Sequence, residues 1–101
     1  MIQIQLSAVS IQRLAITLEG QACSIEARQN GRHLYLSLWK NDEMILGQRV
    51  CRDRSLMLTG ARYRGFSGDL MWIDGQGFDD PQWTGLGSRW TLVYITPAEF
   101  P

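Results

Sequence analysis

Residues that build catalytic and metal sites are scarce in this sequence. Its 101 residues include two cysteines, Cys23 and Cys51, and one histidine, His33, whose spacing matches neither a zinc signature nor a redox cysteine pair. No serine or cysteine nucleophile pattern accompanies the histidine, whereas acid–base catalysis needs a positioned pair of groups. The adjacent Asp79 and Asp80 precede a proline, where carboxylates supply turn hydrogen bonds more often than a cation site. We therefore expect no enzyme activity, no cofactor and no metal, with His33 on a strand surface, Cys23 facing inward and both thiols reduced.

Net charge and long apolar runs are also missing. Ten Lys and Arg residues cancel ten Asp and Glu residues, so no overall field favours nucleic acid or an anionic membrane. No apolar run approaches the ~20 residues that a membrane-spanning helix needs. The start of the chain alternates apolar residues with glutamines and so differs from a signal peptide. We expect a soluble, unprocessed protein without a membrane partner, and its length fits one domain over residues 1–101.

The sequence is rich in hydrophobic alternation with a period of two, which is typical of half-buried strands. Successive runs place their apolar residues at Leu14, Ile16 and Leu18, at Cys23, Ile25 and Ala27, and at Leu34, Leu36 and Leu38. Asn30 and Gly31 lie between the second and third runs and predict a type I′ turn with both residues at its centre. Glu19-Gly20 and Asn41-Asp42 have comparable turn chemistry. Residues 13–50 are therefore predicted to form a four-stranded meander that closes near residues 44–50.

Further short strands are predicted in the second half of the chain, at residues 56–58, 69–74 and 89–96, with glycines between them. No stretch carries a helical stripe with caps. The pattern predicts an all-β fold, either a small antiparallel β-sandwich or a partly closed β-barrel, with six to eight strands. Both faces of the last strand are largely apolar, which indicates a central strand or one that lies against another subunit.

Residues 1–8 have two interpretations. The alternation of Ile2, Ile4 and Leu6 with glutamines fits an arm that pairs with a neighbouring chain. It equally fits the first strand of the domain, because alternating segments most often pair within their own sheet.

A loop over residues 75–88 is long for a β connection, and long loops are usually functional or disordered. It contains Phe78, Trp83 and Leu86 among glycines and acids, and these apolar residues argue against disorder. The loop either folds back over an open end of the sheets or presents Phe78 and Trp83 to a neighbouring subunit. The three residues are candidate interface residues.

An arginine segment provides a second candidate surface. Five of the ten Lys and Arg residues fall within it, at Arg49, Arg52, Arg54, Arg62 and Arg64. Tyr63 and Phe66 lie among or near them, and arginines with aromatic residues are typical of nucleic-acid grooves in small barrels. Arginines are also common at protein interfaces, and Asp53 and Asp69 can neutralise part of the cluster. Nucleic-acid binding is therefore the alternative function, and a protein interface is the preferred interpretation.

The chain resembles the phage baseplate plug family over roughly residues 12–96. The matching features, in order, are the strand from Leu14 to Leu18 with Gly20 and Gln21 after it, the Asn30 turn, Gly68-Asp69-Leu70, Asp80-Pro81, Leu86-Gly87-Ser88-Arg89 and Leu92-Val93-Tyr94. Departures lie at residues 27–29, where the family tends to carry tryptophan or a basic residue, and at residues 33–34, where it has an aromatic residue.

This resemblance implies a structural virion protein of a contractile-tailed bacteriophage or prophage, without enzymatic activity or cofactor. It implies a position at the centre of the baseplate, where the tail tube meets the hub and spike, so that the protein plugs or bridges the hub. We expect other tail and baseplate hub proteins as partners, together with a homo-oligomer. The expected location is the virion, with the host cytoplasm during assembly.

Overall fold

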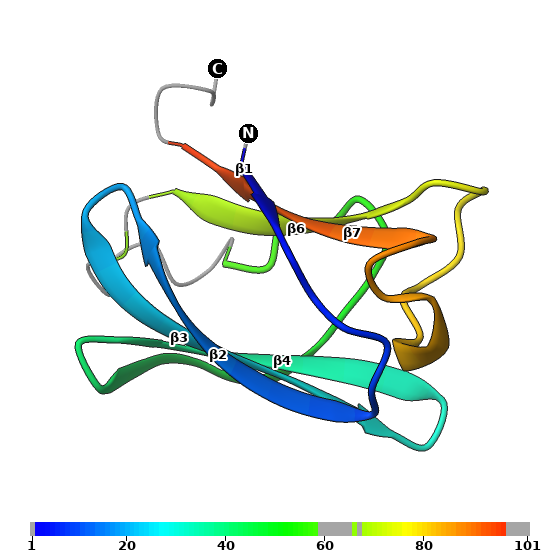
Figure 1. Ribbon diagram of the computed structural model, residues 1–101, viewed down its shortest axis with the longest axis horizontal. Helices are drawn as coiled ribbons and strands as arrows, with labels where there is room; N and C mark the ends of the chain where they lie inside the picture. Colours follow the sequence, from blue (N-terminus) through cyan, green and yellow to red (C-terminus); the bar gives the residue numbers. More distant parts are fainter. Residues whose placement is uncertain (1, 59–65, 67, 97–101) are drawn as a thin grey trace.

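Two antiparallel sheets packed face to face form the fold in a computed structural model, which describes residues 2–58, 66 and 68–96 (Figure 1). One sheet has the strand order β2-β3-β4-β5, and the other has the order β1-β7-β6. The strands are β1 (Ile2–Ile4), β2 (Ile11–Leu18), β3 (Gln21–Asn30), β4 (His33–Lys40), β5 (Glu43–Val50), β6 (Asp69–Asp74) and β7 (Trp90–Ile95). The sheets do not close into a barrel, so the predicted all-β fold is confirmed in its sandwich form.

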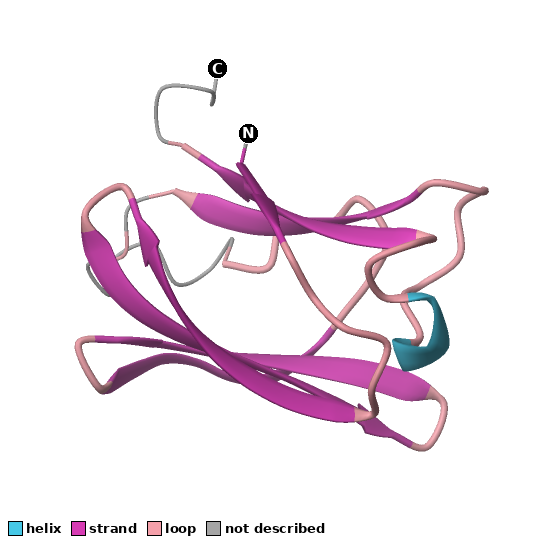
Figure 2. Ribbon diagram, in the orientation of Figure 1, coloured by secondary structure: helices cyan, strands magenta, loops and turns pink. Residues whose placement is uncertain are grey.

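Within the described residues, helical structure is confined to one 3-10 turn, η2 (Trp83–Gly85) (Figure 2). In that part of the chain, no helix has the length and apolar character needed to cross a membrane.

The predicted meander is confirmed, because β2 to β5 pair in sequence order. Glu19 and Gly20 have φ values of 52° and 75°, and Asn41 and Asp42 have 51° and 65°, which are the positive angles of type I′ turns. The turn after β3 differs from its prediction. Asn30 pairs with His33, so the central residues are Gly31 and Arg32, and of these only Gly31 has positive φ. A glycine at the first central position fits a type II′ turn, and Asn30 therefore remains in the strand.

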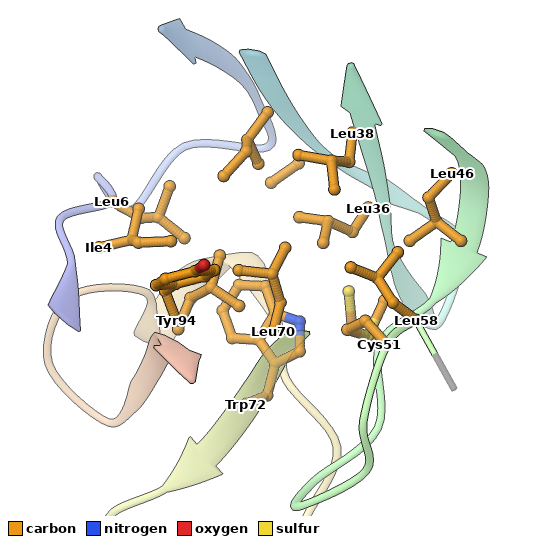
Figure 3. Packing of buried hydrophobic residues seen from close by; sticks show 14 of the residues in the cluster. Ile4, Leu6, Leu36, Leu38, Leu46, Cys51, Leu58, Leu70, Trp72 and Tyr94 are labelled. Carbon is orange, nitrogen blue, oxygen red and sulfur yellow. The ribbon is translucent and has the colours of Figure 1, made fainter. Parts of the chain in front are cut away.

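The core lies between the sheets, where side chains of both layers point toward one another (Figure 3). Its largest fully buried side chains are Trp72 on β6 and Tyr94 on β7. They face a layer of leucines from β4, namely Leu34, Leu36 and Leu38, each 0 % exposed. Burying aromatic side chains against aliphatic ones removes a large apolar area from water, and this burial is the main stabilisation of the sandwich.

Both cysteines are buried free thiols, with Cys23 facing inward as predicted. Burial raises the pKa of Cys51 well above its ordinary value of 9.0, and it raises that of Cys23 as well. Reaction at cysteine requires the thiolate, so these thiols serve as small core residues.

The N-terminal segment is the first strand of its own domain. In β1, Ile2 pairs with Tyr94 and Ile4 pairs with Leu92, and Ile4 is 2 % exposed. In the single chain the segment therefore pairs within its own sheet, and the apolar side chain of Ile4 packs in the core. Pairing with β1 on one side and β6 on the other makes β7 a central strand, as its two apolar faces indicated.

The segment after β5 crosses to the smaller sheet and runs along β6. Asp53 and Leu56 form isolated bridges with Trp72 and Met71, and the Arg54 N–H donates to the Trp72 carbonyl at 2.8 Å. The predicted strand at residues 56–58 is thus reduced to a single bridge at Leu56, and the Leu58 N–H donates to the Asp69 carboxylate at 2.8 Å instead of to a strand carbonyl. This segment carries two of the candidate arginines past the loop between β6 and β7.

Candidate functional site: the 75–88 loop and its arginines

The 75–88 loop joins β6 to β7 and forms one end of the sandwich, beside the turn between β3 and β4 (Figure 1). It ends in η2, which leads into β7. Its path is fixed by three sets of side-chain hydrogen bonds, each reaching a different neighbouring element.

Asp74 holds the loop at its start. Its Oδ1 accepts hydrogen bonds from the Gln76 N–H at 2.9 Å and from Arg89 Nε at 2.8 Å. Its Oδ2 accepts from the Asp79 N–H at 2.9 Å and from Arg89 Nη2 at 2.8 Å. The Asp74 side chain is 0 % exposed, and the bidentate Arg89 guanidinium holds the pKa of this carboxyl well below its ordinary value of 3.8. Asp74 is therefore ionised at neutral pH and fixes both ends of the loop.

Residues 52–54 hold the outer part of the loop. Arg54 donates from Nη1 to the Gly77 carbonyl at 3.1 Å and from Nη2 to the Asp74 carbonyl at 3.3 Å. Asp80 accepts from the Asp53 N–H at 3.0 Å, and Arg52 Nη1 lies 3.4 Å from Asp80 Oδ2. Asp80 thus supplies loop hydrogen bonds, the structural role that its position before a proline indicated.

Glutamines tie the far side of the loop to the β3–β4 turn. Gln29 donates to Gln82 Oε1 at 2.8 Å and accepts from the Trp83 N–H at 3.2 Å. Gln82 in turn donates to the Arg32 carbonyl at 2.8 Å. The loop therefore has a defined position relative to both sheets.

The apolar candidates of the loop have different environments. Phe78 is 83 % exposed and is the most exposed of the described large hydrophobic residues. Trp83 is half-buried and packs against the core. Leu86 is 3 % exposed and bridges to Trp90, so it does not lie at the surface as its candidate role requires. The two interpretations of the loop are therefore combined in one segment: Leu86 and Trp83 cover the sandwich, and Phe78 points outward.

One arginine, Arg54, contacts the exposed phenylalanine. The Arg54 guanidinium carbon lies 4.9 Å from the Phe78 ring centroid, a cation–π distance. Arg52 is exposed beside the same loop, whereas Arg49 is exposed on β5 and donates to the Met57 carbonyl at 2.8 Å. Arg62 and Arg64 lie outside the described residues. Phe78, together with the ion-paired Arg52 and Arg54 beside it, forms an exposed aromatic tip, which we call the Phe78 tip.

Features expected of a nucleic-acid groove are not assembled by the described residues. Phe66 is 4 % exposed and packs edge-to-face on Tyr94, so it cannot stack on a base. Arg52 and Arg54 are paired with Asp80 and Asp53, which neutralises them locally. Tyr63 lies outside the described residues.

The described part of the chain holds no cluster of metal ligands. No set of three or more His, Cys, Asp or Glu side chains there is placed to hold a metal ion. His33 is exposed on β4 and lies beside Tyr35. Aromatic residues and arginines, the residue types of the Phe78 tip, are enriched in protein interfaces.

Sequence reasoning missed the residues that position this surface. Asp74 and Arg89 flank the loop directly, and residues that flank a loop between two paired antiparallel strands lie together, so their opposite charges were an available signal. No comparable signal connects Gln29 with Gln82, which are 53 positions apart.

Comparison with protein families gives a match over nearly the whole chain. The family described as cyanophage baseplate Pam3 plug gp18 matches the chain over residues 1–97. No curated protein matches it. The match spans both sheets, the 75–88 loop and the arginine segment.

Proposed function

The chain belongs to this baseplate plug family, and from that premise we propose that it plugs or bridges the central hub at the end of the tail tube as a noncatalytic protein. Family membership gives the coarser role directly: the chain is a structural component of a phage tail baseplate and associates with other baseplate components. The proposal adds hub and tail proteins as its neighbours, a homo-oligomeric state, and the host cytoplasm as the place of assembly.

The Phe78 tip is the observation that supports a docking role for this end of the sandwich. Phe78 is 83 % exposed, so a partner that covered its ring would remove apolar surface from water and gain binding free energy. The surrounding hydrogen bonds hold the loop in place before binding, which lowers the ordering cost of association. A preformed apolar tip of this kind suits a subunit that must fit between rigid neighbours.

Replacing Phe78 with alanine separates docking from folding. Phe78→Ala is expected to lower the free energy of unfolding of the purified chain by no more than about 0.5–1 kcal/mol, because the exposed ring loses only its cation–π contact with Arg54. In a phage that lacks its own copy, the variant is expected to reduce assembled tails on the order of tenfold or more, as loss of a buried interface anchor does. Urea unfolding and counts of intact tails by electron microscopy measure the two effects.

Trp83→Ala is the matched control within the same loop. Its ring packs on the core, so this variant is expected to lose about 1–3 kcal/mol of stability. Native tail yield with Phe78→Ala would show that the tip is not a docking surface, whereas an unfolded Phe78→Ala chain would assign the ring to folding.

A further inference from the structure

The four sheet edges of the sandwich differ in how they are protected against pairing with other chains. β1 has three residues, and the segment from residue 53 to 57 bridges to β6. The β5 edge has register shifts against β4, and Gln48 has a φ of 39° there, which marks a bulge. Short strands, covering segments and bulges are the usual protections of sheet edges.

The edge at β2 has none of these protections. All eight of its residues, Ile11–Leu18, pair with β3 without a register shift, and the strand contains no proline and no lysine. Among the described strands, β2 has no neighbour on its other side (Figure 1). A long, regular and unprotected edge is a template for another strand.

The hydrogen-bonding groups along this edge can be assigned from the hairpin. The two-residue turn at Glu19-Gly20 makes Leu18 and Gln21 a hydrogen-bonded pair, and bonded pairs then alternate along the ladder. Even-numbered residues therefore bond to β3, and the Ser10 carbonyl, which accepts from the Gln29 N–H at 2.8 Å, follows this rule. Ile11 and the odd-numbered residues after it, through Thr17, direct their N–H and C=O groups away from β3.

This edge is complementary to itself. An antiparallel copy with the twofold axis at Ala15 places Ala15 opposite its equivalent and Arg13 opposite Thr17, and these odd-numbered residues form the hydrogen-bonded pairs. In the same register, the half-buried Leu14 and Ile16 lie opposite each other on the inner face and cover one another. No like charges are opposed within the strand, because Arg13 is its one charged residue.

We propose that two copies of this chain pair through their β2 strands, in the register centred on Ala15, to form one continuous eight-stranded sheet from the two four-stranded sheets. We assign the partner strand to a second copy of this chain. In the described sandwich β2 is the one unprotected edge, and a second copy offers the same edge for pairing. The inference gives a surface for the homo-oligomer of the proposed function and rests on that part of it.

Charge variants at Thr17 test both the pairing and its register. Thr17→Lys places an ammonium opposite Arg13 of the second copy, whereas Thr17→Glu places a carboxylate there, and Thr17 is exposed in the single chain. Sedimentation of the full chain is expected to show a dimer that Thr17→Lys weakens relative to Thr17→Glu by on the order of tenfold in dissociation constant, since the twofold axis doubles each pair. A chain that stays monomeric, or equal dissociation constants for the two variants, would overturn the proposal.

Cysteine crosslinking gives an independent readout of the register. In Ala15→Cys the paired Cα atoms would lie ~5.5 Å apart, within the range of a disulfide, so oxidation is expected to yield a covalent dimer. Ala22→Cys on β3 is the control, because Ala22 is also exposed but lies one strand farther from the axis. Equal crosslinking of the two variants would contradict the register. A monomer found in tail particles would overturn this inference and leave the baseplate role intact.

Discussion

Replacing Trp72 with alanine is expected to remove a large fraction of the free energy of unfolding of this chain. The Trp72 side chain is 0 % exposed and lies at the centre of the contact between the two sheets (Figure 3). Truncating a buried tryptophan removes its burial energy and leaves a cavity, at a cost of about 3–5 kcal/mol. Domains of this size have a total stability of about 5–15 kcal/mol, so this loss is a large fraction of it. Urea unfolding followed by circular dichroism measures the difference.

Trp39→Ala is the matched tryptophan control. Trp39 is half-buried on β4, where the Arg13 guanidinium carbon lies 4.2 Å from its ring centroid. Its truncation is expected to cost about 1 kcal/mol, the scale of an exposed cation–π contact with modest burial. Equal losses for the two variants would contradict a core centred on Trp72.

Replacing Asp74 with alanine is expected to release the 75–88 loop. The change removes the acceptor of the Gln76 and Asp79 N–H groups and leaves Arg89 bonded to Asp79 alone within this network. Loss of these hydrogen bonds destabilises the local structure, so cleavage within the loop by a protease is expected to rise on the order of tenfold. Assembly of tails is expected to fall as with Phe78→Ala, because the tip loses its fixed position.

Asp79→Ala is the control for this network, since the Asp79 side chain is 78 % exposed and its carboxylate accepts from Arg89 alone among these bonds. It is expected to change protease sensitivity little. If Asp79→Ala released the loop as strongly as Asp74→Ala, the buried carboxylate would not be its anchor.

The same carboxylate predicts an acid sensitivity. The pKa of Asp74 is lower in the folded chain than its ordinary value of 3.8, so its stabilisation is complete above about pH 4 and is lost as the pH falls toward the lower, folded value. The native chain is therefore expected to lose more stability between about pH 4 and pH 2 than Asp74→Ala does. Parallel acid profiles of the two chains would contradict this assignment.

Local patterns predicted most of the sandwich, because strand alternation and turn residues are encoded by neighbours in the sequence. The meander from β2 to β5 follows from its alternating leucines and positive-φ turns. The β3–β4 turn was predicted one residue too early. Gly31 was expected at the second central position of a type I′ turn, whereas it occupies the first central position of a type II′ turn.

Contacts between distant segments were beyond these patterns. Whether residues 1–8 pair within their own chain or with a neighbouring chain depends on the availability of β7. The burial of Leu86 depends on how the loop folds over the core. The length and aromatic residues of the loop predict that it covers the sheets or forms an interface, yet its anchors at Asp74 and Gln29 required the three-dimensional structure.

A rigid sandwich with an exposed tip and a pairing edge suits a structural subunit of a baseplate. Quantitative mass spectrometry of density-purified tailed particles from the source of this sequence tests the baseplate role most directly. We expect this chain at a low, fixed ratio to the tube and sheath proteins, a few copies in each tail. Its absence from intact particles would contradict the baseplate role.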